Sequence, residues 1–191
     1  MLSAEDRNLA THLGALVYAN PFLDERIEHE HQILGDGYIA SQPFWSLVFD
    51  LQRKRNIDAI AAKCAELVAR MDRNDPLRED VAIYLLYERY RDGFFDLIAR
   101  GDAIERVEFY ARFRADCEEL LRDAIAPAHL FACFFQVRRA FHHIFDTIVG
   151  RSLSAAKLRA AIWQSVFTHD VRRYRRSLYA RLGDVPTLIT G

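Results

Sequence analysis

The stretch AHLFACFFQVRRAFHHIFDTIV, from Ala128 to Val149, decides the fold class of this chain. Its apolar residues recur every three or four positions and cover most of a helical circumference, a pattern that predicts a helix at the centre of a bundle. Gly150 follows directly and ends the pattern. A helix that is apolar nearly all round needs other helices to cover it.

Amphipathic patterns of helical period flank this stretch on both sides. Ser3 and Asp6 form a capping box that begins the first helix, and Pro21 ends it. Asp75 followed by Pro76 marks a later start, because Asp caps helices and Pro fits the first turn. Only eight Gly and five Pro occur in 191 residues, so we expect an all-α bundle of about seven to nine helices. The remaining helices are expected over residues 22–34, 43–53, 57–71, 76–100, 104–125 and 154–182.

The composition predicts a soluble, cytoplasmic protein. Hydrophobic residues make up 51% and charged residues 28% of the chain, values typical of globular proteins. In the aromatic-rich segment the longest run without formal charge extends from Ala124 to Val137, short of the roughly 20 residues that a bilayer span needs. The amino end carries acids where a secretory signal carries bases. Cys64, Cys117 and Cys133 are odd in number and widely spaced, so we expect buried, reduced thiols.

Charge divides the chain into unequal parts. Between Arg151 and Gly183 eight basic residues accompany one acid, a local charge of +7 that leaves −8 for the rest of a chain with net charge −1. We therefore expect a helical sensory bundle at 1–150, a basic linker helix at 151–183 and a short segment at 184–191. The linker helix has an apolar seam that would dock on the bundle or pair in a homodimer or higher oligomer. The seam consists of Trp163, Phe167, Val171, Tyr174 and Leu178.

A basic patch interrupts this seam. It consists of Arg172, Arg173, Arg175 and Arg176. Contact with DNA is one interpretation of such a patch. The other is that cations near the carboxyl end of a helix complement its dipole, which is the simpler account.

One polar streak crosses the helix expected at the centre. It contains Arg139, His142, His143 and Asp146. His142 and Asp146 are four residues apart and can hydrogen-bond on one helix face. The streak predicts either a signal-binding pocket or a solvent-facing strip within an ordinary interhelical network, and both interpretations stay open.

The segment EHEHQ, residues 28–32, suggests a metal site only superficially. Glu28 and His31 share a helix face in the E-x-x-H spacing of helical di-iron proteins, but no second E-x-x-H occurs in the sequence. We therefore expect a solvated charged face and no metal. Complete phosphate-loop, nucleophile and zinc motifs are also missing, so the sequence nominates no catalytic residue.

The last residues, GDVPTLITG from Gly183 to Gly191, differ from the rest. Val185 to Thr190 is a β-branched run behind a proline, which predicts a short strand. No second strand is evident upstream, so we expect this strand to be an orphan. Its ending TLITG has the form of the strand and first glycine of a phosphate-binding loop, with Gly191 as that glycine.

Two stretches resemble bacterial sigma-54-dependent transcriptional activators. FTHDVRRYRRSLYARLGDVPTLITG, residues 167–191, resembles the junction where a helix leads into the strand before the Walker A loop of their AAA+ ATPase domain. VYANPFLDERIEHE, residues 17–30, is similar to the opening of the helical amino-terminal region in one branch of these regulators. The resemblance implies a regulatory amino-terminal domain, cut at the Walker A loop, that controls assembly or ATPase activity of the downstream AAA+ domain.

The same resemblance implies the partners. The longer protein would bind ATP and magnesium, contact sigma-54 RNA polymerase and bind DNA through other domains, while this part would hold no cofactor. Two alternatives come from other classes: a stand-alone helical ligand sensor or oligomerisation protein, and a helical metal or haem enzyme. The enzyme would use His29, His31, His142 or His143.

Overall fold

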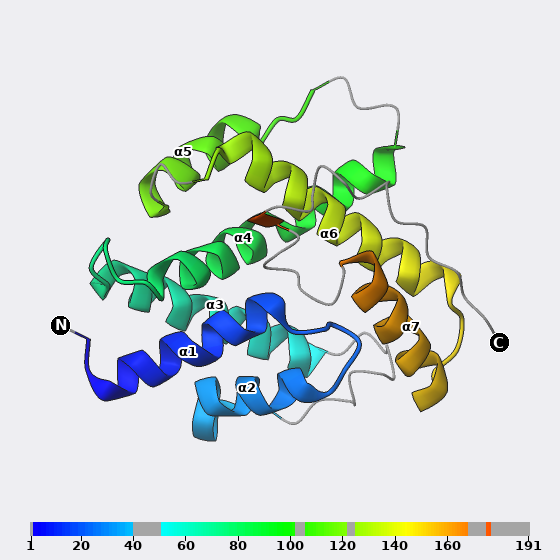
Figure 1. The fold of residues 1–191 in the computed structure, drawn as a ribbon, viewed down its shortest axis with the longest axis horizontal. Coiled ribbons are helices and arrows are strands. Elements are labelled where there is room, and N and C mark those ends of the chain that lie inside the picture. The colour runs from blue at the N-terminus through cyan, green and yellow to red at the C-terminus, as the bar shows by residue number, and fades with distance from the viewer. Residues whose placement is uncertain (1, 40–50, 102–105, 122–124, 168–174, 177–191) are drawn as a thin grey trace.

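The structure of the protein is a computed structural model that describes residues 2–39, 51–101, 106–121, 125–167 and 175–176 (Figure 1). Within these ranges it contains seven α-helices, one short 3-10 turn and no strand, which confirms the all-α bundle. None of the described helices is long and apolar enough to cross a membrane. The elements are α1 (Ala4–Tyr18), α2 (Glu25–Leu34), η1 (Gly35–Gly37), α3 (Leu51–Arg70), α4 (Arg78–Arg100), α5 (Tyr110–Leu120), α6 (Pro127–Thr147) and α7 (Leu153–Val166).

Local signals place several helix ends correctly. Ser3 Oγ accepts a hydrogen bond from the Asp6 N–H at 3.0 Å, which confirms the capping box at the start of α1. Asp75 Oδ1 accepts from the Leu77 N–H at 2.9 Å, but Leu77 is the N-cap of α4, so the predicted start at Asp75 and Pro76 is two residues too early. Gly101 ends α4 with φ of +56°, a left-handed conformation that glycine adopts at little cost.

Other boundaries differ from the sequence prediction. The break expected between residues 53 and 57 is wrong, because α3 runs unbroken from Leu51 to Arg70. No glycine or proline interrupts that stretch, and the Asn56 side chain reaches out of the helix to pair with both backbone groups of Ile39, at 3.0 and 2.8 Å. The long helix expected over 104–125 is also wrong, since α5 covers only Tyr110–Leu120.

The described part of the linker helix begins earlier than predicted and is interrupted after Val166. Ser152, not Ser154, caps α7, and its Oγ accepts from the Ala155 N–H at 3.2 Å. Helix α7 ends at Val166, and most of the predicted remainder up to residue 182 lies outside the described residues. The Phe167 ring packs on Trp163 with centroids 4.5 Å apart, and the sequence continues with Thr168, a weak helix former. The predicted strand at 184–191 and Gly191 lie outside the described residues.

The central helix is α4, so the expectation that α6 occupies the centre is wrong. In Figure 1, α4 passes between α5 and α6 on one side and α1 and α3 on the other, and it contacts all four. In α6 only four residues are buried, because its apolar circumference is divided between two clusters and part of it faces solvent. The buried residues of α4 are Val81, Ala82, Ile83, Tyr84, Leu85, Leu86, Tyr90, Phe94 and Leu97.

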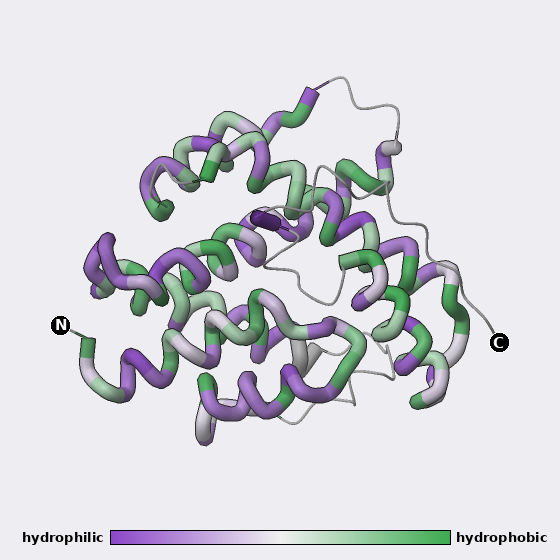
Figure 2. The backbone as a smooth tube through the Cα atoms, viewed as in Figure 1, coloured by the Kyte–Doolittle hydropathy of each residue, from purple (hydrophilic) through white to green (hydrophobic). Residues whose placement is uncertain are grey.

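The larger cluster, here called the main core, joins α1 to α6 around aromatic rings. Phe94 and Phe113 are fully buried, and the Phe94 centroid lies 4.9 Å from that of Phe131. Gly93 is required here, because a Cβ at this position would lie 2.8 Å from the Phe109 ring. Along the tube in Figure 2, hydrophilic and hydrophobic residues alternate within the helices, as expected when each helix has one buried side.

The smaller cluster, here called the junction cluster, attaches α7 to the bundle. Its buried members are Phe22, Ile144, Ala160, Trp163 and Phe167. Arg159 is also buried there and donates hydrogen bonds to the carbonyl oxygens of Ile148 and Gly150, which ties α7 to the end of α6. The seam residues Trp163 and Phe167 thus dock on the bundle of their own chain.

Candidate functional site

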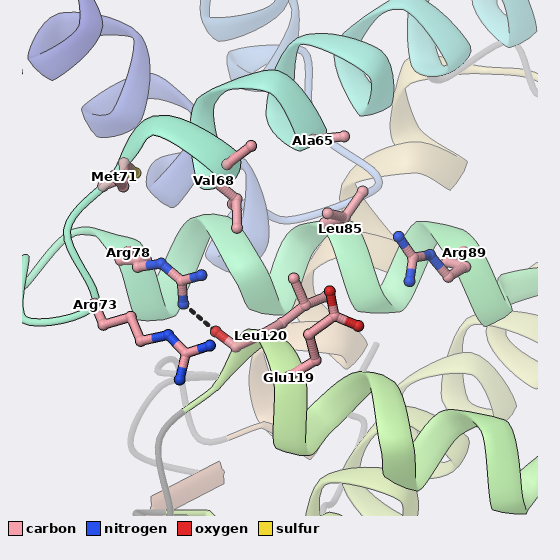
Figure 3. A pocket seen from close by; sticks show the side chains of 10 residues that line it. Ala65, Val68, Met71, Arg73, Arg78, Leu85, Arg89, Glu119 and Leu120 are labelled. Atoms are coloured by element: carbon pink, nitrogen blue, oxygen red, sulfur yellow. Dashed lines mark hydrogen bonds between the residues drawn. The ribbon is translucent and has the colours of Figure 1, made fainter.

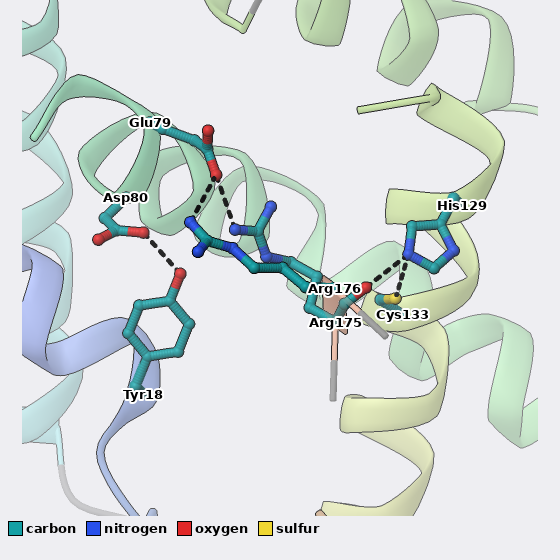
Figure 4. A network of polar contacts seen from close by, with 7 residues as sticks. All are labelled: Tyr18, Glu79, Asp80, His129, Cys133, Arg175 and Arg176. Atoms are coloured by element: carbon teal, nitrogen blue, oxygen red, sulfur yellow. Dashed lines mark hydrogen bonds and ion pairs between the residues drawn. The ribbon is translucent and has the colours of Figure 1, made fainter. Parts of the chain in front are cut away.

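Arg175 meets the first turn of α4 in a buried position (Figure 4). The residue is 6% exposed, and its Nη2 donates to Glu79 Oε1 at 2.7 Å. The side chain of Arg176 is 62% exposed, and its Nη2 lies 4.0 Å from the same carboxylate oxygen. Arg175 and Arg176, two residues of the predicted basic patch, therefore both lie close to Glu79, which is 96 positions from Arg175 in the sequence.

Helix α1 supplies the second side of this site. The Tyr18 hydroxyl donates to Asp80 Oδ1 at 2.5 Å, and Tyr18 also hydrogen-bonds to Arg175. Helices α1 and α4 approach closely here, because a Cβ on Gly14 would lie 3.4 Å from the Asp80 Cβ. Glu79 and Asp80 lie in the first turn of α4, where the helix dipole favours negative charge.

Helix α6 holds the backbone of the same residue. His129 Nε2 lies 2.7 Å from the carbonyl oxygen of Arg175, and since a carbonyl only accepts, this ring nitrogen carries the proton. Cys133 Sγ lies 3.6 Å from the same nitrogen. Burial raises the pKa of Cys133 to about 11, against the opposing effect of the Arg175 charge, so the sulfur is a neutral thiol. We call Tyr18, Glu79, Asp80, His129, Cys133 and Arg175 the Arg175 site.

The electrostatics of the Arg175 site favour a charged arginine. Burial lowers the pKa of Arg175, but the hydrogen bond to Glu79 and the contacts with Tyr18 outweigh it, and the net pKa is raised. A buried cation is tolerated only while its partners are in place, because an unpaired buried charge is strongly destabilising. The buried position of Arg175 therefore depends on its pairing with the Glu79 carboxylate.

The predicted signal-pocket residues lie on the outer side of α6. His142 Nδ1 is 3.3 Å from Asp146 Oδ2, which agrees with the expected four-residue pair. Arg139 and His143 are exposed. The described residues form a cavity between α3, α4 and α5 (Figure 3). None of the four residues lines this cavity, and the signal pocket stays a prediction.

The predicted seam and basic patch are described only in part. Trp163 and Phe167 lie in the junction cluster, as described above. The other members of the seam and basic patch, Val171, Tyr174, Leu178, Arg172 and Arg173, lie outside the described residues.

The histidines and thiols form no metal centre in the part of the chain that is described, where no group of three or more His, Cys, Asp or Glu gathers. His12 and His29 do meet across α1 and α2, with their Nδ1 atoms 3.0 Å apart. Burial and then the neighbouring His29 lower the pKa of His12. Cys64, Cys117 and Cys133 are free and buried, and burial raises the pKa of Cys64 and Cys117 to about 12, which confirms the expectation of buried thiols.

Several residues of the Arg175 site were missed by sequence reasoning. Tyr18, Glu79 and His129 belong to three different helices, and nothing in their local patterns marks them as partners of Arg175. The available signal was global: a charge of −8 on the body opposite +7 on the linker implies that some acids of the body meet bases of the linker.

Comparison with models of protein families, with curated proteins and with solved structures finds no match for this chain. Its function is therefore argued from its own residues.

Proposed function

We propose that this chain is a regulatory domain whose helical bundle reversibly holds the carboxyl-terminal segment, residues 167–191, at the Arg175 site. The observation that carries the proposal is the buried Arg175, which is paired with Glu79 on α4 and held through its backbone by His129 on α6. Buried arginines are costly unless paired, so such a contact acts as a defined docking point for the segment.

A reversible contact can regulate because it has two states of comparable free energy. In the docked state Arg175 contacts α1, α4 and α6, and in the released state its side chain returns to water. A signal that binds one of these states more tightly shifts the population toward it. A domain that follows the segment in the chain would then respond to the change in its attachment.

The proposed target is the AAA+ ATPase domain of a sigma-54-dependent activator. Support comes from the two stretches that resemble these regulators, which meet in the fold. Asn20 and Phe22 of the first stretch contact α7, the helix just before the second stretch: Asn20 Nδ2 donates to the Ala160 carbonyl at 3.1 Å, and the Phe22 ring lies 6.0 Å from Trp163. Tyr18 and Arg175 also belong one to each stretch. Residues 17–30 thus contact α7 and Arg175, and the proposal is that they respond when Arg175 is released.

The remaining parts of the proposal concern the longer protein. ATP and magnesium would bind the AAA+ domain, and sigma-54 RNA polymerase and DNA would be contacted outside this domain. A cytoplasmic location and self-association belong to the same proposal. The DNA segment that follows the Gly191 codon gives a simple check: the proposal requires a glycine, a lysine and then Ser or Thr within a few codons.

The direct test measures ATPase activity of the longer protein with Glu79→Gln. We expect basal activity to change at least threefold, because the variant leaves the Arg175 charge buried without its anion. Glu118→Gln is the matched control, since Glu118 forms only an exposed pair with Arg114 at 3.5 Å. Equal activity of wild type and both variants would contradict the proposal.

A second candidate function is a stand-alone ligand sensor without an ATPase. The solvent-open cavity between α3, α4 and α5 favours it, because ligand sites are concave and partly apolar. A stop codon directly after Gly191 in the gene would support this alternative and exclude the first.

A further inference from the structure

A cavity of about 380 Å³ lies between α3, α4 and the end of α5. This volume is within the range of small-molecule sites. Figure 3 shows Val68, Met71 and Leu85 on its apolar side. Arg73 and Arg78 lie at its other side, where the chain passes from α3 into α4.

The charges around the cavity are unbalanced. Arg73, Arg78 and Arg89 line it together with one acid, Glu119. Arg89 is already paired, because its Nη1 lies 2.6 Å from Asp116 Oδ2. Arg73 is exposed and makes no ion pair with another described residue. An excess of positive charge therefore stays on the side formed by Arg73 and Arg78.

Arg78 is the key group of the cavity. One of its Nη atoms donates to the Leu120 carbonyl oxygen at the end of α5. Its Nε is buried and has no hydrogen-bond partner within the described chain. Burial, and then the nearby charge of Arg73, lower the pKa of Arg78, and Asp72 only partly opposes them. An anion beside Arg78 would offset both effects and satisfy the buried N–H.

We propose that this cavity binds a small anionic molecule with an apolar part. The carboxylate or phosphate of the ligand lies between Arg73 and Arg78, and its apolar part contacts Val68, Met71 and Leu85. The cavity has one charged side and one apolar side. It therefore selects against purely inorganic anions, which contact only the arginines, and against neutral apolar molecules, which contact only the apolar side.

The position of Arg78 suggests how the ligand acts. Arg78 directly precedes Glu79 and Asp80, so the cavity and the Arg175 site share the first turn of α4. A ligand that draws Arg78 toward the cavity changes the orientation of that turn and hence the contact with Arg175. This regulatory link rests on the proposed function, whereas binding to the cavity does not.

The probes are octyl phosphate and octanoate, with inorganic phosphate and 1-octanol as partial matches. Binding is followed in the full chain by NMR of ¹³C-labelled methionine methyl groups. The chain has two methionines, Met71 in the cavity and Met1 at the amino end, so one spectrum contains both the reporter and its internal control. We expect an anionic amphiphile to shift the Met71 signal saturably, and to leave Met1 unchanged.

Charge variants assign the binding to the arginines. Arg73→Gln removes an exposed, unpaired cation, so the fold is retained, and we expect Kd for the stronger anionic probe to rise about tenfold. Arg151→Gln removes an exposed cation of the α6–α7 connection and should leave Kd unchanged. Arg78→Lys, which keeps the charge but loses the fork of donors, should also weaken binding.

Three results would overturn the proposal: no saturable shift of Met71 with either anionic probe, equal Kd for wild type and Arg73→Gln, or tighter binding of 1-octanol than of both anions.

The cavity assignment and the regulatory function can fail separately. If the probes bind but Glu79→Gln leaves ATPase activity of the longer protein unchanged, the cavity assignment stands and the regulatory function fails. If Glu79→Gln alters activity and no probe binds, the reverse holds.

Discussion

The main core and the junction cluster both contain buried aromatic and aliphatic side chains, but they differ in size and in the polar contacts around them. In the main core, Phe94 contacts the rings of Phe109, Phe113, Phe131 and Phe134 and is surrounded by apolar groups. The junction cluster has five buried members, and hydrogen bonds such as that from Asn20 to the Ala160 carbonyl of α7 add to its contacts.

This difference indicates which part of the molecule can move. A large apolar cluster opens only when the whole domain unfolds, whereas a small cluster completed by polar contacts opens locally at lower cost. Regulation requires such a low-cost opening. Under the proposed function, α7 and the junction cluster would open first, while α4 stays held in the main core.

The largest effect is expected from Phe94→Ala in the main core. Removal of this fully buried ring leaves a cavity, which costs about 3–5 kcal/mol of the free energy of unfolding. Chemical denaturation followed by far-UV circular dichroism measures it, and all helices should lose stability together. A loss below about 1 kcal/mol would contradict the central place assigned to α4.

Phe167→Ala makes the matching change in the junction cluster. Phe167 is 1% exposed and packs on Trp163, so we expect a loss of about 2–3 kcal/mol that is concentrated in α7. Amide hydrogen exchange should accelerate at least tenfold in α7 and change little in α4. Equal acceleration in both helices would show that the two clusters open as one unit.

A pH titration tests a polar contact at the edge of the main core, between Asp116 and Tyr90. Burial alone would raise the pKa of Asp116, but hydrogen bonds from Tyr90 and Arg89 outweigh it and the net pKa is lowered. The stabilisation is therefore present above the unfolded-state pKa near 3.8 and is lost as pH falls through the lower folded-state value.

Asp116→Asn should remove this part of the acid sensitivity and cost about 1 kcal/mol at pH 7. The free energy of unfolding, measured from pH 7 to pH 3 for both proteins, gives the difference directly. Parallel curves for wild type and variant would contradict the assigned pairing.

Local signals of the sequence predicted local structure well. The capping box at Ser3 and the stop at Gly101 depend on residues within one helical turn, and both agree with the structure. The choice of central helix was wrong, because α4 and α6 both carry broad apolar stripes and only their neighbours decide which is covered on all sides. Ser152 and Ser154 are likewise equivalent in local pattern.

The Arg175 site could not be derived from the sequence for a related reason. The basic patch was evident, but Glu79 is one of many acids in the body, and its selection depends on how α1, α4 and α6 pack. The cavity beside Arg78 depends in the same way on where α5 ends.

The central claim, that the carboxyl-terminal segment docks through Arg175 on Glu79, is tested most directly by a double-mutant cycle. The free energy of unfolding is measured for wild type, Glu79→Gln, Arg175→Gln and the double variant. The structure predicts a coupling free energy of about 1–3 kcal/mol, because either single variant leaves its partner unsatisfied. Additive effects, with a coupling of less than about 0.3 kcal/mol, would contradict the docked arrangement.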